Sequence, residues 1–199
     1  HLAYNPVINT WDMSLRARGI VLTGAGEPIV LCAVDWVGIG SEGHDMFRQI
    51  LADAAGTDMH RVAVHTVHQH DAPGCDFTAE RILKEHGITP HRYEGTFHRE
   101  VLQRLDTAVR DAMGKQQPIT HLGLGSAPVH KVASNRRIVG PDGKVGPMRG
   151  SSCTNKDLIA APEGVIDPEL SLVSFWNGDT PVAVLIYYAC HPQSYYRTG

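Results

Sequence analysis

The chain has 199 residues, of which 42% are hydrophobic and 20% charged, and its formal net charge is −3. This composition excludes a disordered or low-complexity protein and allows a sizeable core. Without a basic stripe the chain offers no typical nucleic-acid-binding surface, and no uncharged apolar run approaches the roughly 18 residues that span a bilayer.

Strands and helices alternate in the first half of the chain. Two strands are predicted over residues 16–23 and 28–34, and the short Gly-containing connection between them is typical of a hairpin. Apolar residues at helical spacing predict a helix over 44–55, and a short strand follows over 61–66. The helix predicted over 96–113 has the clearest apolar face.

The second half begins with an extended segment over 119–131. Residues 132–164 are rich in Gly, Pro, Ser and Asn and lack periodicity, and loops of this length are usually functional or disordered. Two apolar strands over 170–176 and 181–190 flank Asn177-Gly178-Asp179, a hairpin signal. We therefore predict an α/β fold, a mixed β-sheet with hairpins and flanking helices, with no linker that divides residues 1–199.

Three histidines stand where the strand over 61–66 ends, in the sequence His65-Thr-Val-His68-Gln-His70-Asp71-Ala-Pro-Gly74. In an extended chain His68 and His70 point to one side and can reach one metal ion, whereas His65 of a regular strand points to the other side. Zinc is the predicted metal because imidazole suits it. The alternative is that a chain with 12 histidines places some of them at a strand end as polar caps.

Three further side chains are candidates for the same site. His191 ends an apolar strand before Pro192 and could supply another ligand, because zinc needs three or four protein ligands; a structural histidine is the alternative. Arg136 could bind a carboxylate or stabilise an oxyanion, or belong to a solvated basic turn. Asp35 ends a buried strand and needs a partner, so we expect it to orient a zinc-bound histidine.

Together these segments resemble the amino-terminal domain of the neutral/alkaline non-lysosomal ceramidase family, which are zinc-dependent amidohydrolases. The likeness is carried, in order, by Arg16-Ala-Arg-Gly-Ile-Val-Leu, Ala33-Val-Asp35, His68-Gln-His70-Asp-Ala-Pro-Gly74, Asn135-Arg136 and Ala189-Cys-His191-Pro192.

The resemblance implies a role for each matching residue. His68 and His191 match zinc ligands of the family, His70 lies beside the metal as a ligand or neighbour, and Arg136 matches an active-site arginine. His70 or Asp71 would handle the proton. The family's remaining ligands, a Glu and a Tyr, and its proposed serine would follow Gly199, so we expect residues 1–199 to be the amino-terminal part of one larger catalytic domain.

The expected function is zinc-dependent hydrolysis of an N-acyl amide bond in a lipid or another small molecule. The resemblance also implies a secreted or periplasmic protein that can touch a membrane surface peripherally. Where the family has Ser-Gly this chain has Asp71-Ala72, and where the family has Ser-Pro it has Arg137-Ile138, so ceramide, a shorter amide or an ester all stay open as substrates.

Other classes of protein also place His-x-His after a strand. A metallo-β-lactamase-type hydrolase has its Asp two residues after the second His and another His next, whereas here Asp71 follows His70 at once and Ala72 comes next. A TIM-barrel amidohydrolase does not suit the predicted hairpins. The non-enzymatic alternative is a metal-containing domain that binds a lipid or glycan without turnover.

Overall fold

A computed structural model describes residues 13–150 and 153–192. The chain forms two compact units, of which the first ends at Gln116 and the second begins at Gln117. The division falls in the short polar stretch that follows the helix predicted over 96–113, where the sequence shows no composition typical of a linker.

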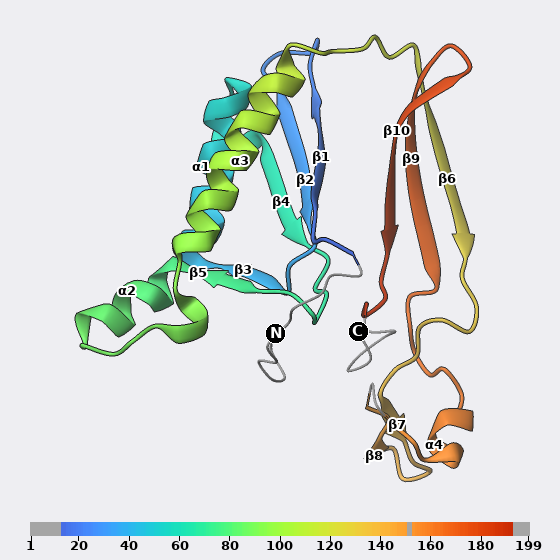
Figure 1. The fold of residues 1–199 in the computed structure, drawn as a ribbon. Coiled ribbons are helices and arrows are strands. Elements are labelled where there is room, and N and C mark those ends of the chain that lie inside the picture. Colours follow the sequence, from blue (N-terminus) through green and yellow to red (C-terminus); the bar gives the residue numbers. More distant parts are fainter. Residues whose placement is uncertain (1–12, 151–152, 193–199) are drawn as a thin grey trace. The chain divides into compact units, whose positions relative to one another are not determined.

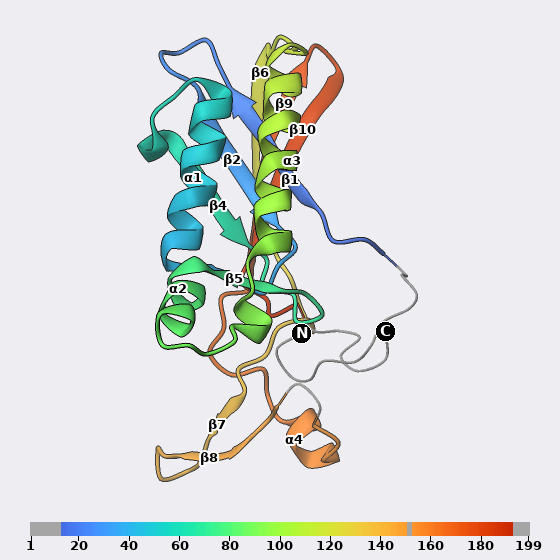
Figure 2. The ribbon, with the colours of Figure 1, turned by 60° about the vertical axis from the view of Figure 1, so that its left-hand side comes forward.

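The first unit is a mixed sheet covered on one face by two helices (Figure 1). The sheet has the order β1-β2-β4, with β1 and β2 antiparallel and β2 and β4 parallel. The helices α1 and α3 lie side by side (Figure 2). These elements are β1 (Ala17–Leu22), β2 (Ile29–Val34), β4 (Val62–Thr66), α1 (Ser41–Ala55) and α3 (Thr96–Met113).

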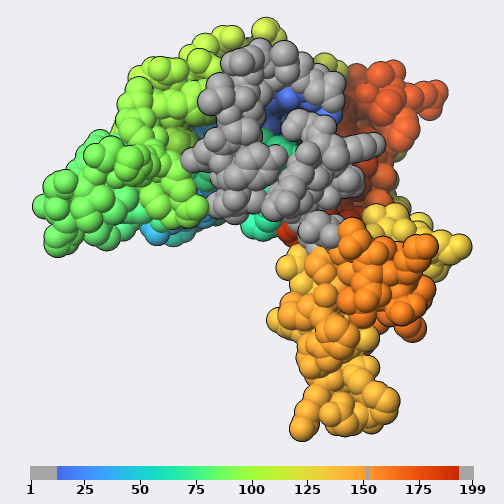
Figure 3. Space-filling view, turned by 60° about the horizontal axis from the view of Figure 1, so that its bottom comes forward, coloured from blue at the N-terminus to red at the C-terminus, as the bar shows by residue number. Residues whose placement is uncertain are grey.

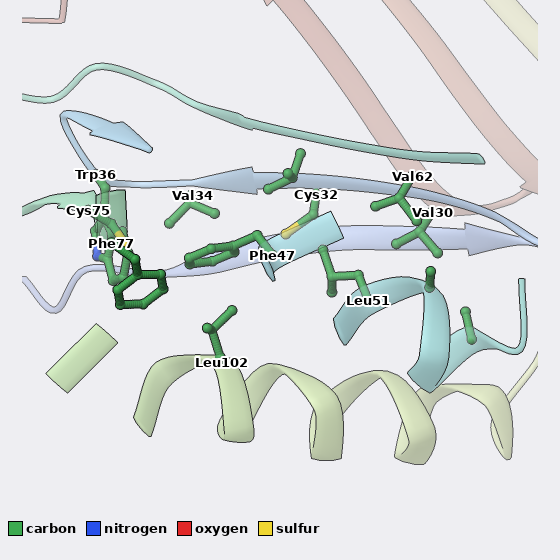
Figure 4. Packing of buried hydrophobic residues seen from close by; sticks show 13 residues of the cluster. Val30, Cys32, Val34, Trp36, Phe47, Leu51, Val62, Cys75, Phe77 and Leu102 are labelled. Atoms are coloured by element: carbon green, nitrogen blue, oxygen red, sulfur yellow. The ribbon is translucent and has the colours of Figure 1, made fainter. Parts of the chain in front are cut away.

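The core of this unit lies between the sheet and the two helices (Figure 4). Val30 and Val34 point from β2 toward the helices, as the two-residue period of a strand requires. Phe47 and Leu51 are one helical turn apart on α1, and Leu102 faces them from α3. Burying each of these side chains contributes about 1.5–3 kcal/mol, which fixes the ends of the strands that carry the site.

Several short elements of the first unit were not predicted. The strands β3 (Gly38–Gly40) and β5 (Gly74–Asp76) form a parallel pair, and α2 (Phe77–Glu85) follows β5 directly. The α2 helix begins where the Asp76 carboxylate accepts a hydrogen bond from the Ala79 amide. It has only nine residues and buries a carboxylate, that of Glu80, so few turns are available to show its apolar face. Two 3₁₀ turns, Met59–Arg61 and His91–Tyr93, complete the unit.

The second unit is built on an antiparallel sheet of order β10-β9-β6. Its strands are β6 (His121–Pro128), β9 (Glu169–Asn177) and β10 (Thr180–Tyr188). The predicted hairpin between β9 and β10 turns at Gly178, whose φ of 56° lies in the left-handed region. The sheets, hairpins and helices of the two units confirm the predicted α/β class.

The long segment between β6 and β9 is not structureless. It contains a hairpin of β7 (Arg137–Val139) and β8 (Val145–Met148) and the short helix α4 (Lys156–Ala160). These elements form the part of the second unit drawn in yellow and orange in Figure 3. No helix of the described ranges is long and apolar enough to cross a membrane.

Candidate metal-binding site

The histidine turn, residues 67–73, connects β4 to β5 in the first unit. At its start the Val67 amide donates to the Val34 carbonyl (3.0 Å), which extends the pairing of β2 with β4. At its end the Pro73 carbonyl accepts from the Val37 amide (3.1 Å). The turn is therefore held at its start by the last residue of β2 and at its end by the segment that follows β2.

His68 has a left-handed backbone, with φ at 59°. This conformation is uncommon for residues other than glycine, and such residues gather at functional sites. Its Nδ1 lies 2.6 Å from the Val37 carbonyl oxygen. Because a carbonyl can only accept, Nδ1 carries the proton and the lone pair of the neutral ring is on Nε2. A backbone acceptor of this kind is the usual partner of a metal-binding histidine.

His70 lies against His68, with ring centroids 4.9 Å apart and the rings nearly perpendicular. The predicted closeness of the two rings is present, but the predicted reason for it is wrong. The strand ends at Thr66, so the two-residue period of an extended chain does not apply beyond it. The left-handed turn at His68 brings the rings together instead. His65 lies within β4 and pairs with Ala33.

The segment that supplies Val37 is anchored in the core. Trp36 is buried, and its ring meets Phe47 edge-on at 5.5 Å and His98 at 5.1 Å between centroids. Burial lowers the pKa of His98, so its ring is neutral at pH 7 and can stay within this apolar cluster. The carbonyl that orients His68 is thus part of a rigid element.

Asp35 is placed differently from our expectation. Its carboxylate accepts a hydrogen bond from the Arg16 amide (2.9 Å), and its own amide donates to the Arg16 carbonyl, so it closes the end of the β1–β2 ladder. The hydrogen bond that orients His68 comes from the Val37 carbonyl. Asp71 follows His70 in the histidine turn, and its amide donates to the Gln69 side chain.

His191 belongs to the second unit and follows β10, at the end of which Cys190 donates its amide to the Tyr188 carbonyl (2.9 Å). The side chain is exposed, as expected for a histidine that leaves an apolar strand before a proline. It lines a cavity of about 950 Å³ within this unit.

Arg136 lines the same cavity as His191, so the second unit brings together two of the predicted site residues. The guanidinium is exposed and makes no hydrogen bond within the described part of the chain. Lys131, Glu163 and Asp167 also border the cavity, as do Ile159 and Ile166, so its wall is mixed in charge and partly apolar.

Three of the predicted residues have the chemistry of metal ligands. His68 and His70 in the first unit and His191 in the second each offer a ring nitrogen that a metal ion can bind. Imidazole is a ligand of zinc, copper, iron and nickel alike, so the residue types do not single out one of these metals.

Comparisons of the chain with models of protein families, with curated proteins and with solved structures find no match. The ceramidase resemblance is therefore carried by the motifs alone and stays a prediction.

Two groups that shape the candidate sites were not predicted from the sequence. The Val37 carbonyl belongs to the backbone, and no residue type announces such an acceptor. Arg149, which lines the cavity and whose guanidinium binds four backbone carbonyls, lies in the segment that lacks periodicity. Its position shortly after the Gly-containing β7–β8 hairpin was the one available signal.

Proposed function

We propose that this chain is the metal-binding part of a zinc-dependent hydrolase that cleaves an N-acyl amide bond. The observation that carries the proposal is the ring of His68, which donates from Nδ1 to the Val37 carbonyl and so presents Nε2 as a metal ligand, next to the ring of His70. A structural polar cap would not need a strained backbone at this residue.

We further propose that His191 binds the same ion as His68 and His70. Catalytic zinc takes three protein ligands and keeps one position for water or substrate, and three imidazoles are one of the established ligand sets. The three histidines fit this donor set. When bound, zinc would lower the pKa of a water molecule and polarise a carbonyl group.

The protein's own side chains have the remaining tasks. Arg136 lines the cavity and its guanidinium makes no hydrogen bond to the residues that the structure describes, so it would hold the oxygen of the amide carbonyl as negative charge develops on it. Asp71, directly after His70, would take the proton of the attacking water and pass it to the leaving amine. His70 would do this only in place of its role as a ligand, because a metal-bound imidazole has no lone pair left to accept a proton. The mixed wall of the cavity suits an amide with both a polar and an apolar part.

The class of substrate is also part of the proposal. A ceramide-like lipid, a shorter N-acyl amide or an ester is consistent with the altered residues Asp71-Ala72 and Arg137-Ile138. A secreted or periplasmic location and peripheral contact with a membrane surface, which the resemblance implies, are the setting in which a lipid amide would be met.

Turnover of a labelled panel tests this function. The full-length protein would be freed of metal with a chelator, reloaded with zinc, and given N-acyl amides of short and long acyl chain together with the matching esters. We expect hydrolysis that disappears with the chelator and returns with zinc. Zinc binding without hydrolysis of any amide or ester would contradict the proposal and favour a domain that binds lipid or glycan.

A further inference from the structure

One side chain ties together separate parts of the segment between β6 and β9. Arg149 directly follows β8 and donates through both terminal nitrogens of its guanidinium. Nη1 binds the carbonyls of Leu158 (2.9 Å) and Ala161 (2.8 Å), and Nη2 binds those of Asn135 (3.1 Å) and Pro162 (3.0 Å). A guanidinium has five N–H donors in a planar fork. All four hydrogen bonds of the Arg149 guanidinium go to backbone carbonyls, so this side chain holds separate parts of the backbone together.

Two hydrogen bonds made by Arg149 hold the backbone on either side of the Arg136 Cα. The side chain of Arg149 binds the carbonyl of Asn135, just before Arg136, and the backbone amide of Arg149 donates to the carbonyl of Arg136 itself (2.8 Å). The peptide groups on both sides of the Arg136 Cα are therefore held. These two bonds fix the direction of the Arg136 Cα–Cβ bond, from which the side chain that carries the guanidinium extends.

Asn135 makes further hydrogen bonds that hold the backbone on the N-terminal side of Arg136. Its side-chain Nδ2 donates to the Val165 carbonyl (3.1 Å), and its Oδ1 accepts from the Arg137 amide (2.9 Å). The Asn135 amide donates to the Glu163 carbonyl (2.7 Å). An exposed loop that only carried a solvated arginine would not need this number of restraints.

The other terminal nitrogen of the guanidinium, Nη1, holds the end of α4, which also contributes residues to the cavity lining. The last carbonyls of a helix lack partners within the helix, and a cation near them is favourable. Arg149 fills this place for α4 by binding Leu158 in the helix and Ala161 just after it. Ile159, Ala161 and Arg136 all line the cavity, so Arg149 links the two segments that carry these lining residues.

We propose that Arg149 is a positioning residue that presents the Arg136 guanidinium to the ligand in this cavity. It acts on the reaction through Arg136 and does not touch the substrate. The proposal rests on the proposed function in so far as its effect is read as hydrolysis.

A double-mutant cycle tests this inference. Arg149→Lys keeps the charge, but a compact ammonium cannot reach four carbonyls at once. Misplacing a reacting group by about 1 Å can cost up to roughly 100-fold in rate. We expect Arg149→Lys to lower kcat/KM by roughly 10–100-fold in the wild-type background. In an Arg136→Gln background the same change should cost less than about threefold, because coupled residues are not additive.

Two further variants guard the interpretation. Arg104→Lys, the same exchange at an exposed arginine of α3 that pairs with Glu100 at the surface, is the control and should leave kcat/KM unchanged. Asn135→Ala removes the Asn135 side-chain hydrogen bonds next to Arg136 without altering Arg149. Its loss in kcat/KM should likewise be larger in the wild-type background than in the Arg136→Gln background. An equal loss for Arg149→Lys in both backgrounds, or no loss at all, would overturn the proposal.

Amide hydrogen exchange separates failure of this inference from failure of the proposed function. In Arg149→Lys the amides of residues 135 and 149 should exchange at least about tenfold faster, while those of β9 stay protected. If the wild type hydrolyses nothing, the function is wrong and this exchange result alone decides the positioning role. Unchanged exchange at both amides would refute the positioning role as well.

Discussion

His68→Ala and His191→Ala should each weaken zinc binding strongly. Removing a residue that only hydrogen-bonds to a metal ligand typically costs roughly 10–100-fold in affinity, and we expect a larger loss for each of these two variants. The reason is that each substitution removes a proposed ligand outright. The two histidines belong to different units, so equal losses would show that one ion uses ligands from both. Zinc affinity would be measured by competition with a chromophoric chelator, and stoichiometry by elemental analysis.

His65→Ala is the matched control for these variants. It lies three residues before His68 and is held in β4, and it does not belong to the group of three possible ligands. We expect its zinc affinity to equal that of the wild type. Unchanged zinc content in both His68→Ala and His191→Ala would contradict the proposed site, whereas a loss in His68→Ala alone would place His191 outside it.

Glu80→Gln should destabilise the first unit, because Glu80 is a buried carboxylate with three charged or polar partners. Its side chain is 2% exposed, and its oxygens accept from Lys84 (2.7 Å), Arg99 (2.6 Å) and the Gly95 amide (3.1 Å). The Arg99 guanidinium also lies over the Phe77 ring. A Cβ at Gly95 would collide with the side chains of Glu80 and Arg99, so the arrangement also requires glycine there.

The size and pH dependence of this effect follow from the pKa. Chiefly the Arg99 hydrogen bond lowers the pKa of Glu80 from 4.5 to about 2. Each unit of pKa is about 1.4 kcal/mol, but Arg99 and Lys84 are about half exposed, so we expect a loss of about 1–3 kcal/mol in the free energy of unfolding. Since the folded pKa is the lower one, this stabilisation is complete above pH 4.5 and is lost as the pH falls toward 2.

Urea unfolding of the wild type and Glu80→Gln at pH 7 and pH 3 measures both features. The gap between the two proteins should be largest at pH 7 and clearly smaller at pH 3. Glu85→Gln is the control, because Glu85 is on the same helix, is exposed, and pairs with Arg81 at the surface. Its effect should stay within about 0.5 kcal/mol, and a gap for Glu80→Gln that does not depend on pH would show that the carboxylate's charge is not what stabilises the unit.

The elements with clear periodicity could be predicted from the sequence, and the reasons are local. The α3 helix was predicted with its bounds, since an 18-residue helix has enough turns to show an apolar face. The β9–β10 hairpin was predicted from Asn177-Gly178, because these residues tolerate the left-handed backbone. The α2 helix was missed because it is short and because Glu80 occupies a buried position that an apolar residue would normally mark.

The candidate site was predictable in its side chains and not in its backbone. His68, His70 and His191 stood out by residue type and by their places after strands, and Arg136 stood out by residue type within the long irregular segment. The Val37 carbonyl and the left-handed φ at His68 did not, since both arise from the way the chain leaves β2 and β4. We expected Asp35 to orient a metal-binding histidine because it is a carboxylate at the end of a buried strand. In the structure its carboxylate instead accepts a hydrogen bond from the Arg16 amide at the end of the β1–β2 ladder.

Nuclear magnetic resonance of the histidine rings in the zinc-loaded protein tests the central claim most directly. Long-range couplings between ring protons and ring nitrogens identify which nitrogen is protonated and which binds metal. We predict that His68 keeps its proton on Nδ1 and binds one zinc ion through Nε2, with His70 and His191 shifting at the same single equivalent of zinc. A His68 ring that zinc leaves unchanged, or one that binds through Nδ1, would contradict the account.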